Sequence, residues 1–235
     1  VRNSEISLPG MKKTVIKKPL VTQSLEPIYQ VWGWTLLAWS LYRYFFKLPE
    51  AVDELIAKPL VFVVPVLWYV YKIEKRKIDS LGLTAKNLFM SLYVGVGFGF
   101  VFALEGVAAN AIKYGKIQIN PIAAFEQYGM MTLLILTVAT AVSEEILNRG
   151  FLFGRIMEKT KNLPYASLLS TGLFMLLHVP ILVTNLKLNG MMLALFFLTD
   201  FILGMANSLL YYNTKSLLAP ILVHVFWNMT VALYL

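Results

Sequence analysis

The sequence predicts an all-α protein embedded in a membrane, with about seven transmembrane helices around a polar cavity near mid-membrane. Of the 235 residues, 58% are hydrophobic and 14% are charged, whereas a soluble domain carries roughly 25% charged residues. Apolar stretches long enough to cross a bilayer recur along the whole chain. Ionisable side chains interrupt three of these stretches at a similar depth. Together these features predict an integral membrane protein with a polar interior.

The crossings are predicted, in chain order, at residues 28–46, 55–71, 88–112, 130–153, 164–183, 191–212 and 217–235. The third, fourth and sixth stretches each have room for a break, so an eighth crossing can be hidden there. No connection is long enough for a soluble domain, which makes residues 25–235 one membrane-embedded domain. Residues 1–24 are polar and basic and lack the short apolar core of a signal peptide, so we expect a cytoplasmic tail.

The net charge is +8, and the distribution of the basic residues along the chain indicates how the protein is oriented in the membrane. With the N-terminus in the cytoplasm, 15 of the 21 basic residues lie in cytoplasmic segments, as the positive-inside rule requires. The C-terminus is then expected outside, and membrane lipids are the expected surroundings. Nucleic acid is not an expected partner, since basic residues without a soluble fold are not typical of DNA binding. The six basic residues in outer segments are Arg43, Lys47, Lys58, Lys113, Lys116 and Lys187.

The stretch AVSEEILNRGF, residues 141–151, places charges at the end of an apolar run. Charged side chains at bilayer depth cost about 2.5–3.5 kcal/mol each, so they need partners or a function. Glu145 and Arg149 are four residues apart, with the acid first, which favours a helical ion pair. Glu144 points about 100° away around the helix. We therefore expect a structural Glu145–Arg149 pair beside an unpaired Glu144, which suits a general base.

Two further motifs pair polar or aromatic residues at helical spacing. FMLLH places Phe174 and His178 on one helical face, and HVFWN does the same for His224 and Asn228. Neutral imidazole and the Asn amide both donate hydrogen bonds, as groups that stabilise an oxyanion must. The chain has no Cys, and neither His is followed by Glu, so thiolate chemistry and the HExxH zinc motif are excluded.

Depth along the helices brings the three motifs to one level. Counted from the inner edge, Glu144, His178 and His224 lie roughly 15–20 Å deep, which predicts a single site. Each residue alone also fits a packing role, as an interhelical ion pair, a buried His or a helix-linking Asn. Asp200 lies mid-helix without a partner four residues away; it either pairs with another helix or lines the cavity, and we assign it no catalytic role.

In order and spacing, the three motifs resemble those of the CAAX protease and bacteriocin-processing family (CPBP, also called Abi), which includes the type II CAAX prenyl endopeptidases. The pattern EExxxR, FxxxH and HxxxN is present here as Glu144 to Arg149, Phe174 to His178, and His224 to Asn228. The resemblance is carried by the core at residues 128–235. Two residues depart from the expected pattern: Asn148 replaces an aromatic residue, and Asp200 replaces a small one.

The resemblance implies an endopeptidase that cuts a membrane-associated protein or peptide, including prenylated tails. Glu144 would activate a water with help from His178, and His224 with Asn228 would form the oxyanion hole. Glu145, Arg149 and Phe174 would support the site. The family is commonly called metalloprotease, and zinc would take Glu144, His178 and His224 as ligands. A Glu-activated water needs no metal, so no cofactor is the favoured expectation.

Two other functions use the same residues. A proton-coupled transporter or channel would use Glu144, His178, Asp200 and His224 as a relay, but the sequence shows no inverted repeat or broken helix. A membrane scaffold or immunity protein without catalysis would bind a partner through the same cavity.

Overall fold

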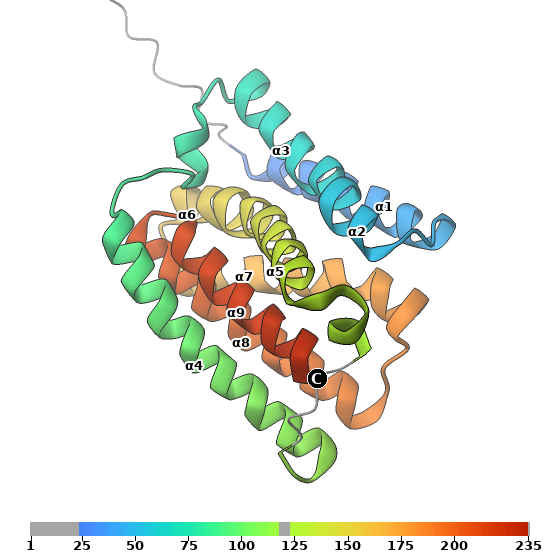
Figure 1. The fold of residues 1–235 in the computed structure, drawn as a ribbon. Helices are drawn as coiled ribbons and strands as arrows, with labels where there is room; N and C mark the ends of the chain where they lie inside the picture. The colour runs from blue at the N-terminus through green and yellow to red at the C-terminus, as the bar shows by residue number, and fades with distance from the viewer. Residues whose placement is uncertain (1–23, 118–122, 235) are drawn as a thin grey trace, which may run out of the picture.

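The structure is a computed structural model that describes residues 24–117 and 123–234, all-helical in that part of the chain (Figure 1). This confirms the all-α prediction. The predicted tail at residues 1–24 lies, except for Ser24, outside the described residues. The helices are α1 (Glu26–Phe45), α2 (Glu50–Val52), α3 (Val64–Trp68), α4 (Leu88–Tyr114), α5 (Ala123–Glu145), α6 (Gly154–Thr160), α7 (Leu163–Ile181), α8 (Gly190–Thr214) and α9 (Leu218–Tyr234).

Several of these helices continue into π-helical segments. These are η1 (Asp53–Ala57), η2 (Pro59–Val63), η3 (Tyr69–Ile73), η5 (Ile146–Phe153) and η6 (Leu182–Leu186), and η4 (Ile78–Leu81) is a 3₁₀ turn. Isolated π-helical turns inside helices are frequent at functional sites, because they rotate side chains away from the regular α-helical positions. Here they flank Lys58 and follow Glu145.

The helices follow the predicted apolar stretches, but the crossing count is not confirmed. Within residues 24–117 and 123–234, four helical units are long and apolar enough to cross a membrane: Leu88–Tyr114, Gly129–Thr160, Leu163–Leu186 and Gly190–Thr214. The apolar part of α9 that the structure describes, Leu218–Val231, is shorter. The second predicted crossing is split into short α and π segments. The prediction of seven or eight crossings therefore stays a prediction.

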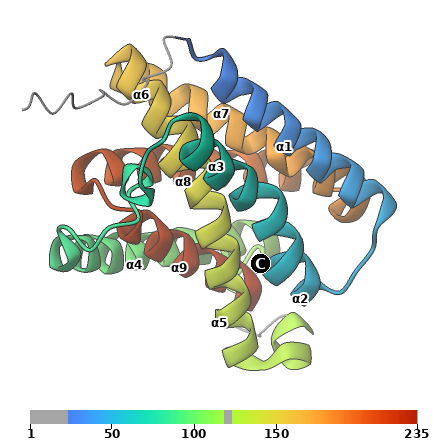
Figure 2. The same cartoon turned by 90° about the horizontal axis from the view of Figure 1, so that it is seen from above.

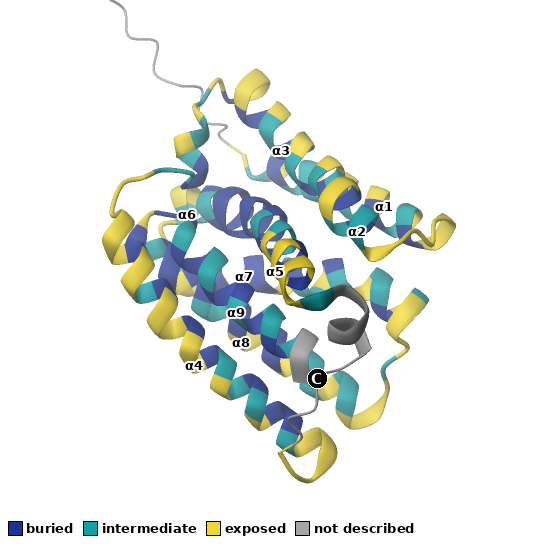
Figure 3. Cartoon of the chain, viewed as in Figure 1, coloured by how far each residue is buried: buried dark blue, intermediate teal, exposed yellow. Residues whose placement is uncertain are grey.

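The unit formed by α5, η5 and α6 lies at the centre of the molecule, between α1–α3 on one side and α4 and α9 on the other (Figures 1 and 2). All residues from Ser143 to Phe153 are buried, and Figure 3 shows this segment in the colour of buried residues. Gly150 is required here, because a Cβ atom at this position would lie 2.7 Å from the Leu81 carbonyl oxygen. The EExxxR motif is thus built into the core.

Close packing of α4 on α9 positions the last motif. A Cβ atom at Gly99 would lie 2.4 Å from the Phe226 ring, and one at Gly106 would lie 2.4 Å from Thr230. Gly95 meets α9 in the same way, whereas Gly97 has nothing within 4 Å. Close packing of these two helices therefore involves Gly95, Gly99 and Gly106 but not Gly97. This contact holds the helix that carries His224 and Asn228.

Candidate functional site

A cavity of about 560 Å³ lies between the α2–η1 segment and helices α4, α5, α7, α8 and α9. Glu144, His178, His224 and Asn228 all line it, and so does Asp200. These residues come from α5, α7, α8 and α9, which the sequence places far apart. The prediction that the three motifs meet at one place is therefore confirmed as geometry.

Adjacent Glu144 and Glu145 point to different surroundings, as their helical positions predict. Glu145 is fully buried, and its Oε2 lies 3.3 Å from the Arg149 Nε. Its other oxygen lies 2.8 Å from His224 Nδ1 and accepts a hydrogen bond of 3.0 Å from the Asn207 side chain. The predicted structural ion pair is confirmed, and Glu145 also orients the imidazole of His224.

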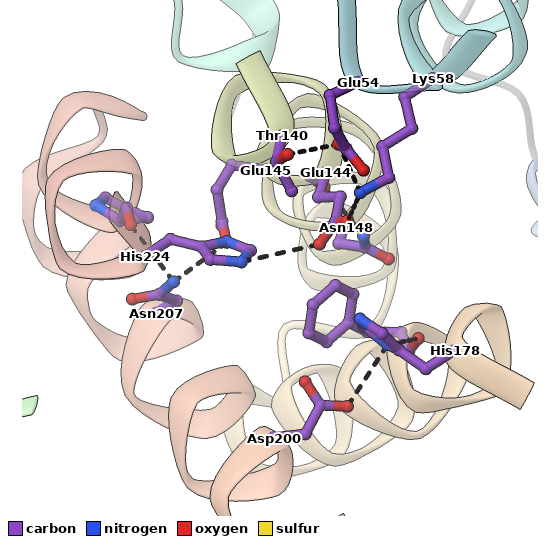
Figure 4. A network of polar contacts seen from close by, with 12 residues as sticks. Glu54, Lys58, Thr140, Glu144, Glu145, Asn148, His178, Asp200, Asn207 and His224 are labelled. Atoms are coloured by element: carbon purple, nitrogen blue, oxygen red, sulfur yellow. Dashed lines mark hydrogen bonds and ion pairs between the residues drawn. The ribbon is translucent and has the colours of Figure 1, made fainter. Parts of the chain in front are cut away.

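The prediction that Glu144 is unpaired is wrong. Its Oε1 lies 2.8 Å from the ammonium of Lys58, which also lies 2.7 Å from Oε2 of Glu54 (Figure 4). Thr140 in turn donates a hydrogen bond to Glu54. A buried carboxylate is costly unless paired, and here the partner comes from a helix 86 residues earlier. The sequence placed Lys58 in an outer segment, but the structure buries it in the cavity wall.

His224 lies between the two carboxylates. Its Nδ1 faces Glu145, and its Nε2 is 3.6 Å from Oε2 of Glu144, longer than a direct hydrogen bond (Figure 4). A neutral ring that donates from Nδ1 to Glu145 has no proton on Nε2. As long as Nδ1 donates to Glu145, donation from Nε2 into the cavity therefore requires the doubly protonated ring. A neutral ring donates from Nε2 only if Nδ1 carries no proton, so the expectation of a neutral imidazole donor stays a prediction.

His178 and Asp200 form a second pair across the cavity. The Nδ1 of His178 lies 3.3 Å from the Phe174 carbonyl oxygen and 3.5 Å from Oδ2 of Asp200 (Figure 4). Asp200 thus pairs with another helix and also lines the cavity, which are the two roles left open for it by the sequence. The hydrogen-bond partner of Nδ1 is the Phe174 carbonyl oxygen, and Oδ2 of Asp200 is a buried neighbour of that atom without a hydrogen bond of its own.

Phe174 and Asn148 support the site without lining the cavity. The Phe174 ring is packed against the Arg149 guanidinium at 4.5 Å, the His178 ring at 4.8 Å and the His224 ring at 6.1 Å. Asn148 is buried and donates a hydrogen bond of 2.8 Å to the backbone carbonyl of Glu144. That bond satisfies the carbonyl where the α-helix changes to the π-helical η5, so Asn148 does not contact the cavity.

Sequence reasoning missed four residues of this network: Glu54, Lys58, Thr140 and Asn207. One signal was present, because Glu50, Glu54 and Lys58 follow each other at four-residue spacing and so share a helical face. No comparable pattern marks Asn207. Its role depends on the distance between α5 and α8.

We expect Lys58→Met to destabilise the protein, because it leaves the buried Glu144 and the partly buried Glu54 without their shared cation. Removing one partner of a buried ion pair costs about 3–5 kcal/mol. The measurement is the thermal unfolding midpoint in detergent, with Lys187→Met on an exposed loop as the matched control. Lys58→Arg should retain most of the stability. Equal midpoints for Lys58→Met and the control would mean that the cation is not needed.

The expected zinc ligands do not form a metal-binding group in this arrangement. Among the described residues, no group of three or more His, Asp or Glu side chains is placed to hold a metal ion. The cation next to Glu144 is the Lys58 ammonium, and Nδ1 of His224 is engaged by Glu145. Lys58 contacts Oε1 of Glu144, whereas Oε2 faces Nε2 of His224 at 3.6 Å, so these two atoms are the ones that would turn toward an ion.

Comparison with known proteins agrees with the motifs. No curated protein and no solved structure matches the chain. One family model matches residues 126–230, a range that holds Glu144, His178, His224 and Asn228 but excludes Lys58. The family is described as type II CAAX prenyl endopeptidase Rce1-like, and this match confirms the resemblance read from the three motifs.

Proposed function

We propose that the chain is an intramembrane endopeptidase in which Glu144 activates a water molecule. The observation that carries this proposal is that Glu144, His178, His224 and Asn228 all line one cavity. Within that cavity, Lys58 holds the carboxylate of Glu144 in place. The family match supports the reaction class. The substrate is a membrane-associated protein or peptide, and a prenylated tail is the substrate class that the family description names.

The two carboxylate oxygens of Glu144 have separate roles in this mechanism. Lys58 holds Oε1, so Oε2 is left facing His224 and the cavity. A water bound there transfers a proton to Oε2 while its oxygen attacks the peptide carbonyl carbon. His178, whose Nδ1 is engaged by the Phe174 carbonyl oxygen, helps to position that water. The proton on Glu144 then passes to the amide nitrogen as the C–N bond breaks, which releases a carboxylic acid and an amine.

The carbonyl oxygen becomes negatively charged in the tetrahedral intermediate and needs donors. His224 in its doubly protonated form and the Asn228 amide, one helical turn further along α9, are the candidates. Preorganised donors in a site with little water stabilise such a charge strongly. Glu145 supports this role by holding Nδ1 of His224 at 2.8 Å.

A metal-free reaction is part of the proposal. The buried Lys58–Glu144 contact and the engagement of His224 by Glu145 support it. If zinc is used, Glu144, His178 and His224 are the residues that would hold it, and the ion would polarise the bound water.

We expect Asn228→Ala to lower turnover by about 10²–10³, with substrate binding nearly unchanged, because one oxyanion donor is lost. Activity of the purified enzyme should also survive slow dialysis against a strong chelator in detergent. The readouts are kcat and KM on a cleaved peptide, and the zinc content per chain. Activity lost in chelator and regained with zinc, together with stoichiometric zinc, would assign the reaction to a metal.

The experiment that tests the proposed function separates it from the two alternatives. Purified protein in liposomes is incubated with a peptide pool, and cleavage and proton flux are both measured. Cleavage that disappears in Glu144→Gln supports the protease. Proton flux without cleavage supports the relay through Glu144, His178, Asp200 and His224. The absence of both activities supports a scaffold.

A further inference from the structure

We infer that the site takes its substrate from the face of the protein opposite the basic loops, which is the extracytoplasmic face. The substrate is then a peptide segment exposed to the outer half of the membrane. This inference rests on the proposed function for the reaction, but the side from which the cavity is reached is a separate property of the fold.

The cavity lies in one half of the bundle. Helices α4 and α7–η6 end at the face marked by Tyr114 and Leu186, and α8 begins there at Gly190; we call this the cavity face (Figure 1). Most lining residues of each helix come from the half nearest that face, and His224 lies two residues beyond the midpoint of α9. Lys113 of α4 and Leu188 of the following loop lie at its rim, and Glu144 lies at the inner end.

The other half of the bundle is closed. Every residue from 143 to 153 is buried, so the segment that follows Glu144 has no route to solvent. Phe151, Phe153, Leu81 and Leu217 are each at most 1% exposed and belong to one packed hydrophobic cluster. The backbone N–H of Leu217 donates a hydrogen bond of 2.9 Å to the Gly82 carbonyl, which joins the two loops over this cluster. A peptide cannot reach Glu144 from that side without unpacking the core.

Basic residues mark the closed half as cytoplasmic. We call it the basic face, because within the described residues it carries Lys72, Lys75, Arg76, Lys77, Lys86, Lys159, Lys161 and Lys215, with Arg155 left out because it is buried in an ion pair with Glu74. The cavity face carries Lys47, Lys113, Lys116 and Lys187. Arg43 and Lys58 do not count toward that face, because both are buried in ion pairs. The positive-inside rule places the face richer in Lys and Arg in the cytoplasm.

The chemistry of the substrate follows from this orientation. A prenylated C-terminal tail on the cytoplasmic surface would meet the closed core instead of the cavity. A peptide that reaches the site must present its scissile bond from the outer side, as an exported peptide or the outer segment of a membrane protein does. The proposed activity is therefore directed to such peptides.

Cysteine labelling tests the orientation, because the 235-residue sequence has no Cys. The full chain is produced in cells as three variants, Asn185→Cys at the cavity face, Leu195→Cys in the cavity wall and Asp79→Cys at the basic face. None of the three changes the count of Lys and Arg. A membrane-impermeant maleimide is then added to intact or permeabilised cells, and the unchanged chain gives the background.

We expect Asn185→Cys and Leu195→Cys to be labelled in intact cells, and Asp79→Cys to be labelled only after permeabilisation. The reverse pattern would overturn the inference and open the cavity to the cytoplasm. Failure to label Leu195→Cys under both conditions would also overturn it, since the cavity would then not be reached from outside.

The substrate is tested by comparing peptide termini in cells with the unchanged chain and with Glu144→Gln. New termini confined to extracytoplasmic segments support the inference, and new termini confined to cytoplasmic segments overturn it. If no termini differ, the proposed protease and its substrate both fail, while the labelling result still decides the orientation of the cavity.

Discussion

Glu144→Gln should lower peptide cleavage by about 10²–10⁴-fold, the contribution expected of a general base. Gln cannot take the proton from water, although it fills the same space. The protein should stay folded, because Lys58 keeps Glu54 as an ionic partner at 2.7 Å and the Gln amide oxygen still accepts a hydrogen bond from it. Initial rates of cleavage in detergent, together with the thermal midpoint, measure both effects.

Glu105→Gln is the matched control for this experiment. Glu105 is also a carboxylate within an apolar helix, but it belongs to α4 and does not line the cavity. Its variant should cleave at the rate of the unchanged chain. A Glu144→Gln protein that is folded and still active would remove Glu144 from the mechanism, whatever the control does.

Arg149→Met should strongly destabilise the protein. Arg149 is 1% exposed, lies 3.3 Å from Glu145 and stacks on the Phe174 ring. Its loss leaves Glu145 buried without a cation, at a cost of about 3–5 kcal/mol. For a chain of this size each kcal/mol lowers the thermal midpoint by about 2–4 °C, so a decrease of roughly 6–20 °C is expected.

Arg76→Met provides the comparison for an exposed ion pair. Arg76 pairs with Glu158 at 2.8 Å, but Glu158 is 42% exposed, so water already solvates the pair. Such pairs contribute about 0–1 kcal/mol. If the two Arg variants lower the midpoint equally, burial of the Glu145–Arg149 pair is not what makes it important, and its assigned structural role fails.

The sequence by itself determined the features that depend on neighbours along one helix. Spacing of four residues predicted the Glu145–Arg149 pair, and it also placed His224 and Asn228 on the same side of α9. Helical geometry sets the angle and rise between such residues, so no other part of the chain is needed to predict them. The apolar stretches likewise predicted that the protein is all-helical, because the length and composition of each stretch are also local properties of the chain.

The tertiary structure alone decided which residues from different helices meet. Lys58 and Glu144 are 86 residues apart, and Asn207 and Glu145 are 62 residues apart, yet each pair is in direct contact. The prediction of an unpaired Glu144 failed because no local pattern shows where a distant helix brings its cation. Helical periodicity gives the direction of a side chain within its own helix, but the rotation and shift of one helix against another come from packing, as where Gly99 meets Phe226.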